Sequence, residues 1–260
     1  MSNSLQRLCE IVAQLRAPSG CPWDREQTHA TLLPSLLEEA YEVADAIRTN
    51  DDANLREELG DLLLLVIMHA EIATEEGRFT IDDVAREISD KLVRRHPHVF
   101  GESDARDSGA VVKQWDAIKR AERNATDAPY FAGLTRGLPA LMRAQKAQAK
   151  AARVGFDWKK ISEVIAKLDE ELDETKEAIA SKDSATIADE IGDLLFAAVN
   201  LARKNKLDAE TILAAATEKF IARFHAMELE LKNHGKKLGE VDLPEMDRVW
   251  DQLKRVKASA

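Results

Sequence analysis

The sequence has few cysteines, and their scarcity excludes a disulfide-stabilised scaffold. Cys9 and Cys21 are the two cysteines among 260 residues, and both lie in the first half of the chain. Small secreted domains that depend on disulfides carry more cysteines at regular spacings. Two thiols without a framework of partners therefore predict a protein of the reducing cytoplasm.

Long apolar runs and a positive net charge are also missing. The apolar stretch at 62–68 is far too short to span a bilayer, and no apolar signal region is visible near residue 1. The formal net charge of −10 argues against a wide surface for nucleic acid or for an anionic membrane. We therefore expect neither nucleic acid nor a membrane among the partners.

Aromatic residues are scarce as well, at 5% of the chain, and no stretch alternates long enough to predict a sheet. Ala, Leu, Glu, Lys and Arg dominate, and these residues favour helices. A hydrophobic content of 45% with 32% charged residues suits a globular protein. The composition predicts an all-α fold, and the length is sufficient for two domains.

One carboxylate pattern occurs twice in this chain. Two adjacent glutamates are followed three residues later by a third, and a Glu-x-x-Asp pair comes further on. The second copy follows the first by about 130 residues. The acids are Glu38, Glu39, Glu42, Glu58 and Asp61 in the first copy, and Glu170, Glu171, Glu174, Glu190 and Asp193 in the second.

The spacing of these acids predicts a metal site in each copy. Acids three residues apart project from one side of a helix, and two such helices face to face would surround one small volume. Carboxylates packed that closely repel one another unless a cation lies among them. We therefore predict Mg²⁺, with Mn²⁺ as a substitute. The predicted ligands are Glu39, Glu42, Glu58 and Asp61, and Glu171, Glu174, Glu190 and Asp193.

The residues after each Glu-x-x-Asp pair support this interpretation. They are apolar on all sides at 62–68 and 194–199, so burial is expected, and charges on a buried helix need a partner ion. Gly60 and Gly192 stand between the acids, where glycine costs about 1 kcal/mol relative to alanine. We expect a neighbouring helix or a ligand to approach them closely. The alternative, a solvated acidic face, does not explain why the pattern recurs.

The acids belong to a longer repeat. An aromatic turn precedes them, at 21–24 and 155–158, and a Lys-x-x-x-Arg pair and a Trp-x-x-x-Lys pair follow them. The basic residues would bind phosphates, and tryptophan stacks on any base. Alone, such residues are more often solvated charges and core anchors. The predicted substrate-binding residues are Lys91, Arg95, Trp115 and Lys119, and Lys219, Arg223, Trp250 and Lys254.

Helical periodicity divides the chain into two bundles. Residues 127–138, rich in proline and glycine, predict a linker between an N-terminal domain, 1–126, and a C-terminal domain, 139–260. The tandem order indicates a duplicated helical-bundle domain. Helices are predicted over 5–15, 33–48, 55–76, 81–95, 109–123, 139–153, 161–180, 185–205, 209–232 and 244–257.

Beyond the acids, several short motifs resemble the MazG nucleoside triphosphate pyrophosphohydrolases, in particular their two-domain bacterial form. The resemblance covers essentially the whole chain. Its motifs are Cys21-Pro22-Trp23-Asp24, Gln27-Thr28-His29, Gly60-Asp61-Leu62-Leu63, Glu76-Gly77-Arg78-Phe79, the run 91–100, and in the second half 154–158, 192–196, 200–203 and 218–220.

The resemblance implies hydrolysis of nucleoside triphosphates to nucleoside monophosphates and pyrophosphate, with Mg²⁺ held by the acids. It also implies a homodimer of all-α domains, broad base tolerance and a role in nucleotide-pool control. In this family the C-terminal copy is usually assigned the activity, so Glu171, Glu174, Glu190 and Asp193 are the predicted catalytic residues. No acid is missing from the first copy.

Two alternatives remain open at this point. A di-iron carboxylate bundle needs Glu-x-x-His on two helices, and Glu26 with His29, the one match near a motif, has no counterpart in the second half. A non-catalytic nucleotide-sensing module is the other alternative, above all for the N-terminal domain.

Overall fold

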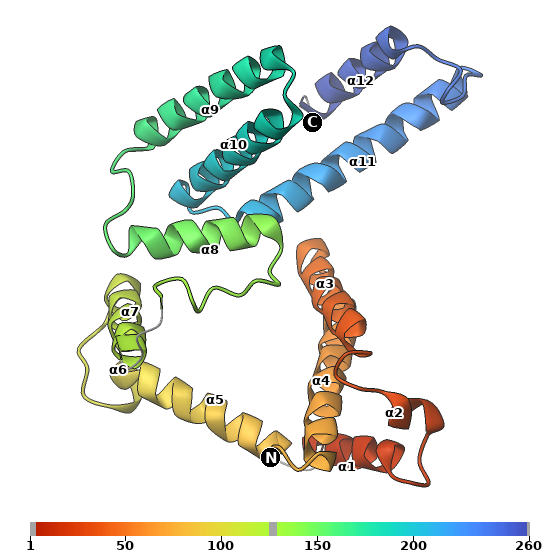
Figure 1. Cartoon of the computed structure of the whole chain (residues 1–260). Helices are drawn as coiled ribbons and strands as arrows, with labels where there is room; N and C mark the ends of the chain where they lie inside the picture. Colours follow the sequence, from red (N-terminus) through yellow and green to blue (C-terminus); the bar gives the residue numbers. More distant parts are fainter. Residues whose placement is uncertain (1–3, 125–128, 259–260) are drawn as a thin grey trace. The chain divides into compact units, whose positions relative to one another are not determined.

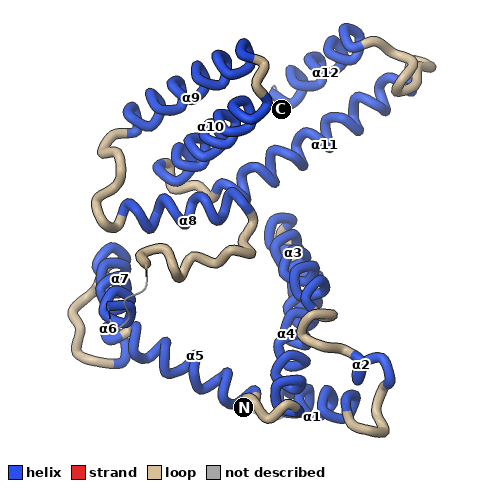
Figure 2. Tube along the Cα trace, in the orientation of Figure 1, coloured by secondary structure: helices blue, strands red, loops and turns tan. Residues whose placement is uncertain are grey.

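The structure is a computed structural model that describes residues 4–124 and 129–258 (Figure 1). Every regular element within those ranges is a helix, and they contain no strand (Figure 2). The all-α prediction is therefore confirmed. None of the helices in the described ranges is long and apolar enough to cross a membrane.

The chain divides into two compact units, Met1–Thr126 and Asp127–Ala260, called the N-terminal and C-terminal units below. All ten predicted helices occur in the described residues, with each end within three residues of its prediction. The short helices α2 and α6 were not predicted. The N-terminal unit contains α1 (Ser4–Arg16), α2 (Pro22–Glu26), α3 (Leu33–Thr49), α4 (Asp52–Glu75), α5 (Ile81–Arg95), α6 (Pro97–Phe100) and α7 (Ser108–Asn124). The C-terminal unit contains α8 (Ala140–Ala152), α9 (Ile161–Ser181), α10 (Ser184–Lys204), α11 (Ala209–Asn233) and α12 (Leu243–Ala258).

The two acidic helices of each unit form a helical hairpin with the same turn. Asn50 and Lys182 end the first helix of each pair in the left-handed region, with φ of 59° and 61°. The next residue then caps the second helix, because Asp51 and Asp183 accept hydrogen bonds from backbone N–H groups of its first turn. This short connection makes α3 antiparallel to α4 and α9 antiparallel to α10.

The hydrophobic cores of the two units differ in size. Side chains from α1, the 27–32 loop and α4 form the N-terminal core, with Val12, Ile67 and Met68 almost completely buried. The C-terminal core joins Val199 and Ala202 of α10 to Ala209 at the start of α11, with α8 packed against them. Each core therefore covers one side of its Glu-x-x-Asp helix.

The prediction that 62–68 and 194–199 are buried on all sides is wrong for the single chain. Leu195 and Phe196 are 55% and 46% exposed, and Leu63 and Val66 are also exposed. A Cβ atom added at Gly60 or Gly192 would meet nothing within 4 Å, so no neighbouring helix in the described residues approaches them. Because α4 and α10 pack on one side only, their other sides are left open.

A partly buried ion pair fixes the loop between α8 and α9. Both Nη atoms of Arg203 donate to the Asp157 carboxylate, at 2.5 and 3.2 Å, and Lys204 donates to the Trp158 carbonyl at 2.6 Å. Burial alone would raise the pKa of Asp157, but hydrogen bonds from Arg203 and Lys204 outweigh it and lower that pKa. These bonds attach the 155–158 loop to α10.

We expect Asp157→Asn to lower the free energy of unfolding by about 1–3 kcal/mol, because Arg203 would lose its charged partner. Since the folded-state pKa of Asp157 is below its unfolded value, this stabilisation is complete above the unfolded pKa of about 4. It disappears as the pH falls through the lower folded-state pKa. Thermal unfolding followed by circular dichroism at neutral and acidic pH measures both effects.

Asp173→Asn is the matched control, because Asp173 pairs with Lys176 on an exposed face of α9 and such pairs contribute little. Equal thermal stability of the Asp157→Asn variant and the wild type at neutral pH would contradict the role of the pair.

Candidate metal and nucleotide site

The α9–α10 hairpin brings three of the predicted acids together. Glu171, Glu174 and Glu190 each place one carboxylate oxygen within 4.8 Å of the other two. Thr175 supports them, because its hydroxyl donates to the Glu171 carbonyl at 2.7 Å and lies 3.4 Å from the Glu190 carbonyl on the facing helix. Glu171 is buried, whereas Glu174 is exposed. A small ion between the two helices would have oxygen ligands from both.

The N-terminal hairpin forms a matching cluster from a different set of three acids. Glu39, Glu58 and Asp61 place one oxygen each within 4.8 Å of one another. Glu42 lies outside this group, although its charge contributes to raising the pKa of Glu39 and of Glu58. In the C-terminal unit the residue left outside is Asp193, the counterpart of Asp61. Each predicted set of four acids is thus three clustered acids and one neighbour.

Both clusters have the chemistry of a cation site. Burial, followed by the neighbouring carboxylates, raises the pKa of Glu39 and of Glu58. Burial also raises the pKa of Glu174, although the charge of Lys167 acts against it. Glu39 Oε2 is buried and accepts no hydrogen bond. Clustered carboxylate oxygens whose mutual repulsion is at most partly relieved fit a hard divalent cation such as Mg²⁺ or Mn²⁺.

Lys167 is a site residue that the sequence analysis missed. Its ammonium lies 2.7 Å from Glu171 and 2.7 Å from Glu170, and these bonds raise the pKa of Lys167 above its usual range. The position that matches it in the first copy is Ser35. Its spacing from Glu171 is that of an ordinary surface ion pair, so the sequence alone did not single it out.

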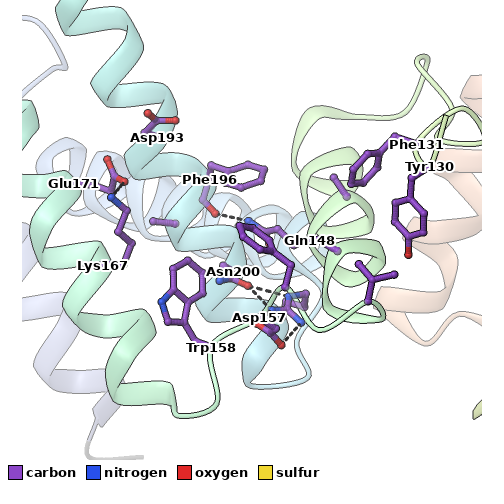
Figure 3. A pocket seen from close by; sticks show the side chains of 16 residues that line it. Tyr130, Phe131, Gln148, Asp157, Trp158, Lys167, Glu171, Asp193, Phe196 and Asn200 are labelled. Atoms are coloured by element: carbon purple, nitrogen blue, oxygen red, sulfur yellow. Dashed lines mark hydrogen bonds and ion pairs between the residues drawn. The ribbon is translucent and has the colours of Figure 1, made fainter.

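A pocket of about 410 Å³ adjoins the C-terminal cluster, and small-molecule sites have this size. Glu171, Lys167 and Asp193 lie at one end of it, and Trp158 and Phe196 contribute aromatic surface (Figure 3). Polar groups in its lining are fixed by hydrogen bonds. Gln148 donates to the Phe196 carbonyl at 2.8 Å, and Arg203 donates to Asn200 at 2.7 and 2.9 Å.

The predicted substrate-binding residues of the C-terminal unit gather on α11 and α12. The Arg223 guanidinium lies 5.2 Å from the Trp250 ring centroid, and Phe220 packs against the same ring. Lys219 is exposed, and Lys254 pairs with Asp251 at 3.0 Å. In the part of the chain that the structure describes, no hydrogen bond or ion pair joins these residues to the acids.

In the N-terminal unit the equivalent arginine is already occupied. Arg95 donates to Glu122 at 2.6 Å and Arg94 donates to the same carboxylate at 2.8 Å, and these bonds lower the pKa of Glu122 to about 2. Trp115 stacks edge-on against His96, with ring centroids 4.9 Å apart. Lys91 is half-buried on α5, and the side chain of Lys119 lies outside the described residues.

Comparison with known proteins shows to which family this chain belongs. The family model described as the MazG nucleotide pyrophosphohydrolase domain matches residues 27–100 and 159–227, so it matches both hairpins. A nucleoside triphosphate pyrophosphohydrolase from Escherichia coli K12 is 49% identical over 97% of this chain and 98% of its own length. Thermotoga maritima has a nucleoside triphosphate pyrophosphohydrolase/pyrophosphatase MazG that is 45% identical over 96% of this chain and 95% of its own length.

A third relative, the uncharacterised protein YabN of Bacillus subtilis, is 42% identical over 95% of this chain but only 51% of its own length. The matches thus include proteins of similar length and a longer one. The family model matches both repeats, and close to half of all positions are identical over nearly the whole length of two curated relatives. This chain therefore belongs to the MazG nucleotide pyrophosphohydrolase family.

Proposed function

We propose that this protein hydrolyses nucleoside triphosphates to nucleoside monophosphates and pyrophosphate in an Mg²⁺-dependent reaction, mainly in its C-terminal unit. The observation that carries the proposal is the cluster of Glu171, Glu174 and Glu190 at one end of the 410 Å³ pocket. The acids supply a place for the ion, and the pocket supplies a place for the rest of a nucleotide. The names of the two full-length relatives support the same activity.

In this mechanism Glu171, Glu174 and Glu190 would hold the ion, with Asp193 on the next turn of α10 as a fourth acid. Once bound there, the ion would supply stabilisation of phosphoryl charge and a more acidic water. Lys167 pairs with Glu170 and Glu171 at 2.7 Å, so its ammonium would become available to phosphate oxygens once an ion binds the acids in its place. Arg223 and Lys219 contribute further cationic donors, and α9 and α10 keep the acids in position throughout.

Broad base tolerance follows from the lining of the pocket. Its surface is mostly apolar and aromatic, and its polar side chains are largely engaged with one another. Stacking on apolar walls does not read the hydrogen-bonding edge of a base, so every base is accepted and any preference comes from the strength of stacking. We propose that the protein acts on the nucleotide pool in general, in the cytoplasm, where Cys9 and Cys21 stay free thiols.

We propose further that two copies form a homodimer and that α11 and α12 of one copy complete the site of the other. Two observations support this. The open side of α10 exposes Leu195 and Phe196, and exposed apolar patches are typical of interaction surfaces. No hydrogen bond or ion pair joins Arg223 or Trp250 to the acids of their own chain among the described residues. A symmetric dimer would cover the patch and supply the cations together.

A nucleotide-sensing role is the second candidate for the N-terminal unit. It retains a carboxylate cluster, but Glu122 binds the arginine that would otherwise hold phosphate. This ion pair favours weak or absent turnover in that unit.

Glu190→Gln is expected to lower turnover by at least about a hundredfold, because it removes an ion ligand that stabilises transition-state charge. Pyrophosphate release from ATP measures the effect, and EDTA should abolish activity of the wild type. Glu177→Gln, an exposed glutamate of α9 outside the cluster, is the matched control and should keep full turnover. Orthophosphate as the primary product would contradict the proposed reaction.

The two units are expected to contribute unequally. Glu171→Gln should abolish most ATP hydrolysis and Glu39→Gln should leave most of it, because the C-terminal cluster has Lys167 and the adjoining pocket. Initial rates of pyrophosphate release by the two folded variants compare the sites directly. Equal losses of activity in the two variants would show that both units hydrolyse ATP.

The dimer is tested by complementation. Arg223→Ala should weaken nucleotide binding while leaving the affinity for Mn²⁺ alone nearly unchanged, since it spares the acids. If the cations act across the interface, mixing the Arg223→Ala and Glu190→Gln proteins, at an ATP concentration too low for either alone to turn over appreciably, should restore part of the activity, because some mixed dimers have one intact site. No recovery after subunit exchange, shown by labelled chains, would mean that both residues serve the same copy.

A further inference from the structure

The segment that precedes α8 contributes two aromatic side chains to the C-terminal pocket. Tyr130 and Phe131 line it together with residues of α8, α10 and the 154–158 loop. Figure 3 shows both rings on the far side of Gln148 from Glu171 and Lys167. The pocket therefore has the acids at one end and these rings at the other.

Three kinds of contact hold this aromatic pair in place. The Tyr130 hydroxyl donates to the Lys150 carbonyl of α8 at 2.7 Å. The two rings meet edge to face, with centroids 5.2 Å apart. The Lys150 ammonium lies 5.0 Å from the Tyr130 centroid and 5.4 Å from the Phe131 centroid, distances typical of cation–π contacts. Backbone turns at Pro129–Ala132 and Phe131–Leu134 fix the segment itself.

The position of Lys150 indicates what kind of ligand the two rings could bind. It is only 7% exposed, and lysine is almost never buried without compensation. Its charge is directed at the faces of two rings that remain partly open, with Phe131 47% exposed. A ring polarised by a cation on one side presents its other surface to a stacking partner, and an aromatic base is such a partner.

We propose that Tyr130 and Phe131 form the far wall of the nucleotide pocket and make it favour purine over pyrimidine triphosphates. The inference rests on the proposed function, which places the triphosphate at the acids. With the phosphates held at that end, the larger bicyclic base reaches the wall and stacks on it. A monocyclic base does not reach the wall, so it gains less free energy from stacking.

The first test compares Phe131→Leu with the wild type. Leucine keeps apolar volume but removes the ring face, so kcat/KM for ATP should fall about tenfold while that for CTP stays within about twofold. Phe79→Leu is the matched control, because Phe79 is an exposed phenylalanine of the N-terminal unit, and it should leave both values unchanged. Equal losses for ATP and CTP, or no loss for either, would overturn the proposal.

Binding of the products gives a second readout that does not need turnover. Calorimetry without metal should show AMP affinity falling about tenfold in Phe131→Leu and CMP affinity unchanged. Tyr130→Phe keeps the ring but loses the bond to Lys150, so it should raise KM for ATP without changing kcat. Circular dichroism melting confirms that each variant is folded.

The outcomes separate the two proposals. If the wild-type protein binds AMP but releases no pyrophosphate, the proposed function is wrong. The role of Tyr130 and Phe131 in binding the base is then tested by AMP affinity alone. If Phe131→Leu and the wild type bind AMP equally well, the proposal that Phe131 stacks on the base is wrong, even if hydrolysis is normal. A wild-type protein that binds neither ATP nor AMP overturns both.

Discussion

Mutual repulsion among carboxylates is the constraint on which both halves of this molecule depend. Three acidic oxygens within 4.8 Å of one another are unfavourable at neutral pH unless positive charge lies nearby. The hairpins hold them there because each turn brings its two helices side by side. Capping by Asp51 and Asp183 fixes where α4 and α10 begin, and therefore which acids face the partner helix. Each hairpin therefore holds negative charge close together, and in the C-terminal unit Lys167 neutralises part of it.

The two copies retained the acids and diverged in what neutralises charge around them. Lys167 stands in the C-terminal cluster where the first copy has Ser35. The helices that carry the predicted phosphate-binding residues differ in the opposite sense, because there it is the first copy that has the neutralising partner. Glu122 neutralises Arg94 and Arg95 in the N-terminal unit, whereas the residue equally far beyond the closing tryptophan in the second copy is Lys257. Two sites with identical acid motifs can thus differ in their readiness to bind a polyphosphate.

Periodicity and recurrence were sufficient to predict the helices, the duplication and the acids that meet. They could not predict which three of each four acids cluster, because the spacing of the four is identical in the two copies, yet Asp61 joins the N-terminal cluster and Glu174 the C-terminal one. Lys167 was missed because its bond to Glu171 has the spacing of any surface pair. The apolar run around Leu195 was expected to be buried because hydropathy does not show which side of a helix packs against its neighbours. The pocket depends on side chains from five separate segments, which no local pattern joins.

The residue at the tip of each hairpin has a consequence for how the chain unfolds. Asparagine tolerates the left-handed region comparatively well, so Asn50 suits its position, whereas Lys182 occupies the same conformation at a higher backbone energy. The C-terminal hairpin also has the smaller buried core. Each unit has its own core and its own turn, so we expect each to have its own free energy of unfolding. The turn residues Asn50 and Lys182 are one place where those two free energies differ.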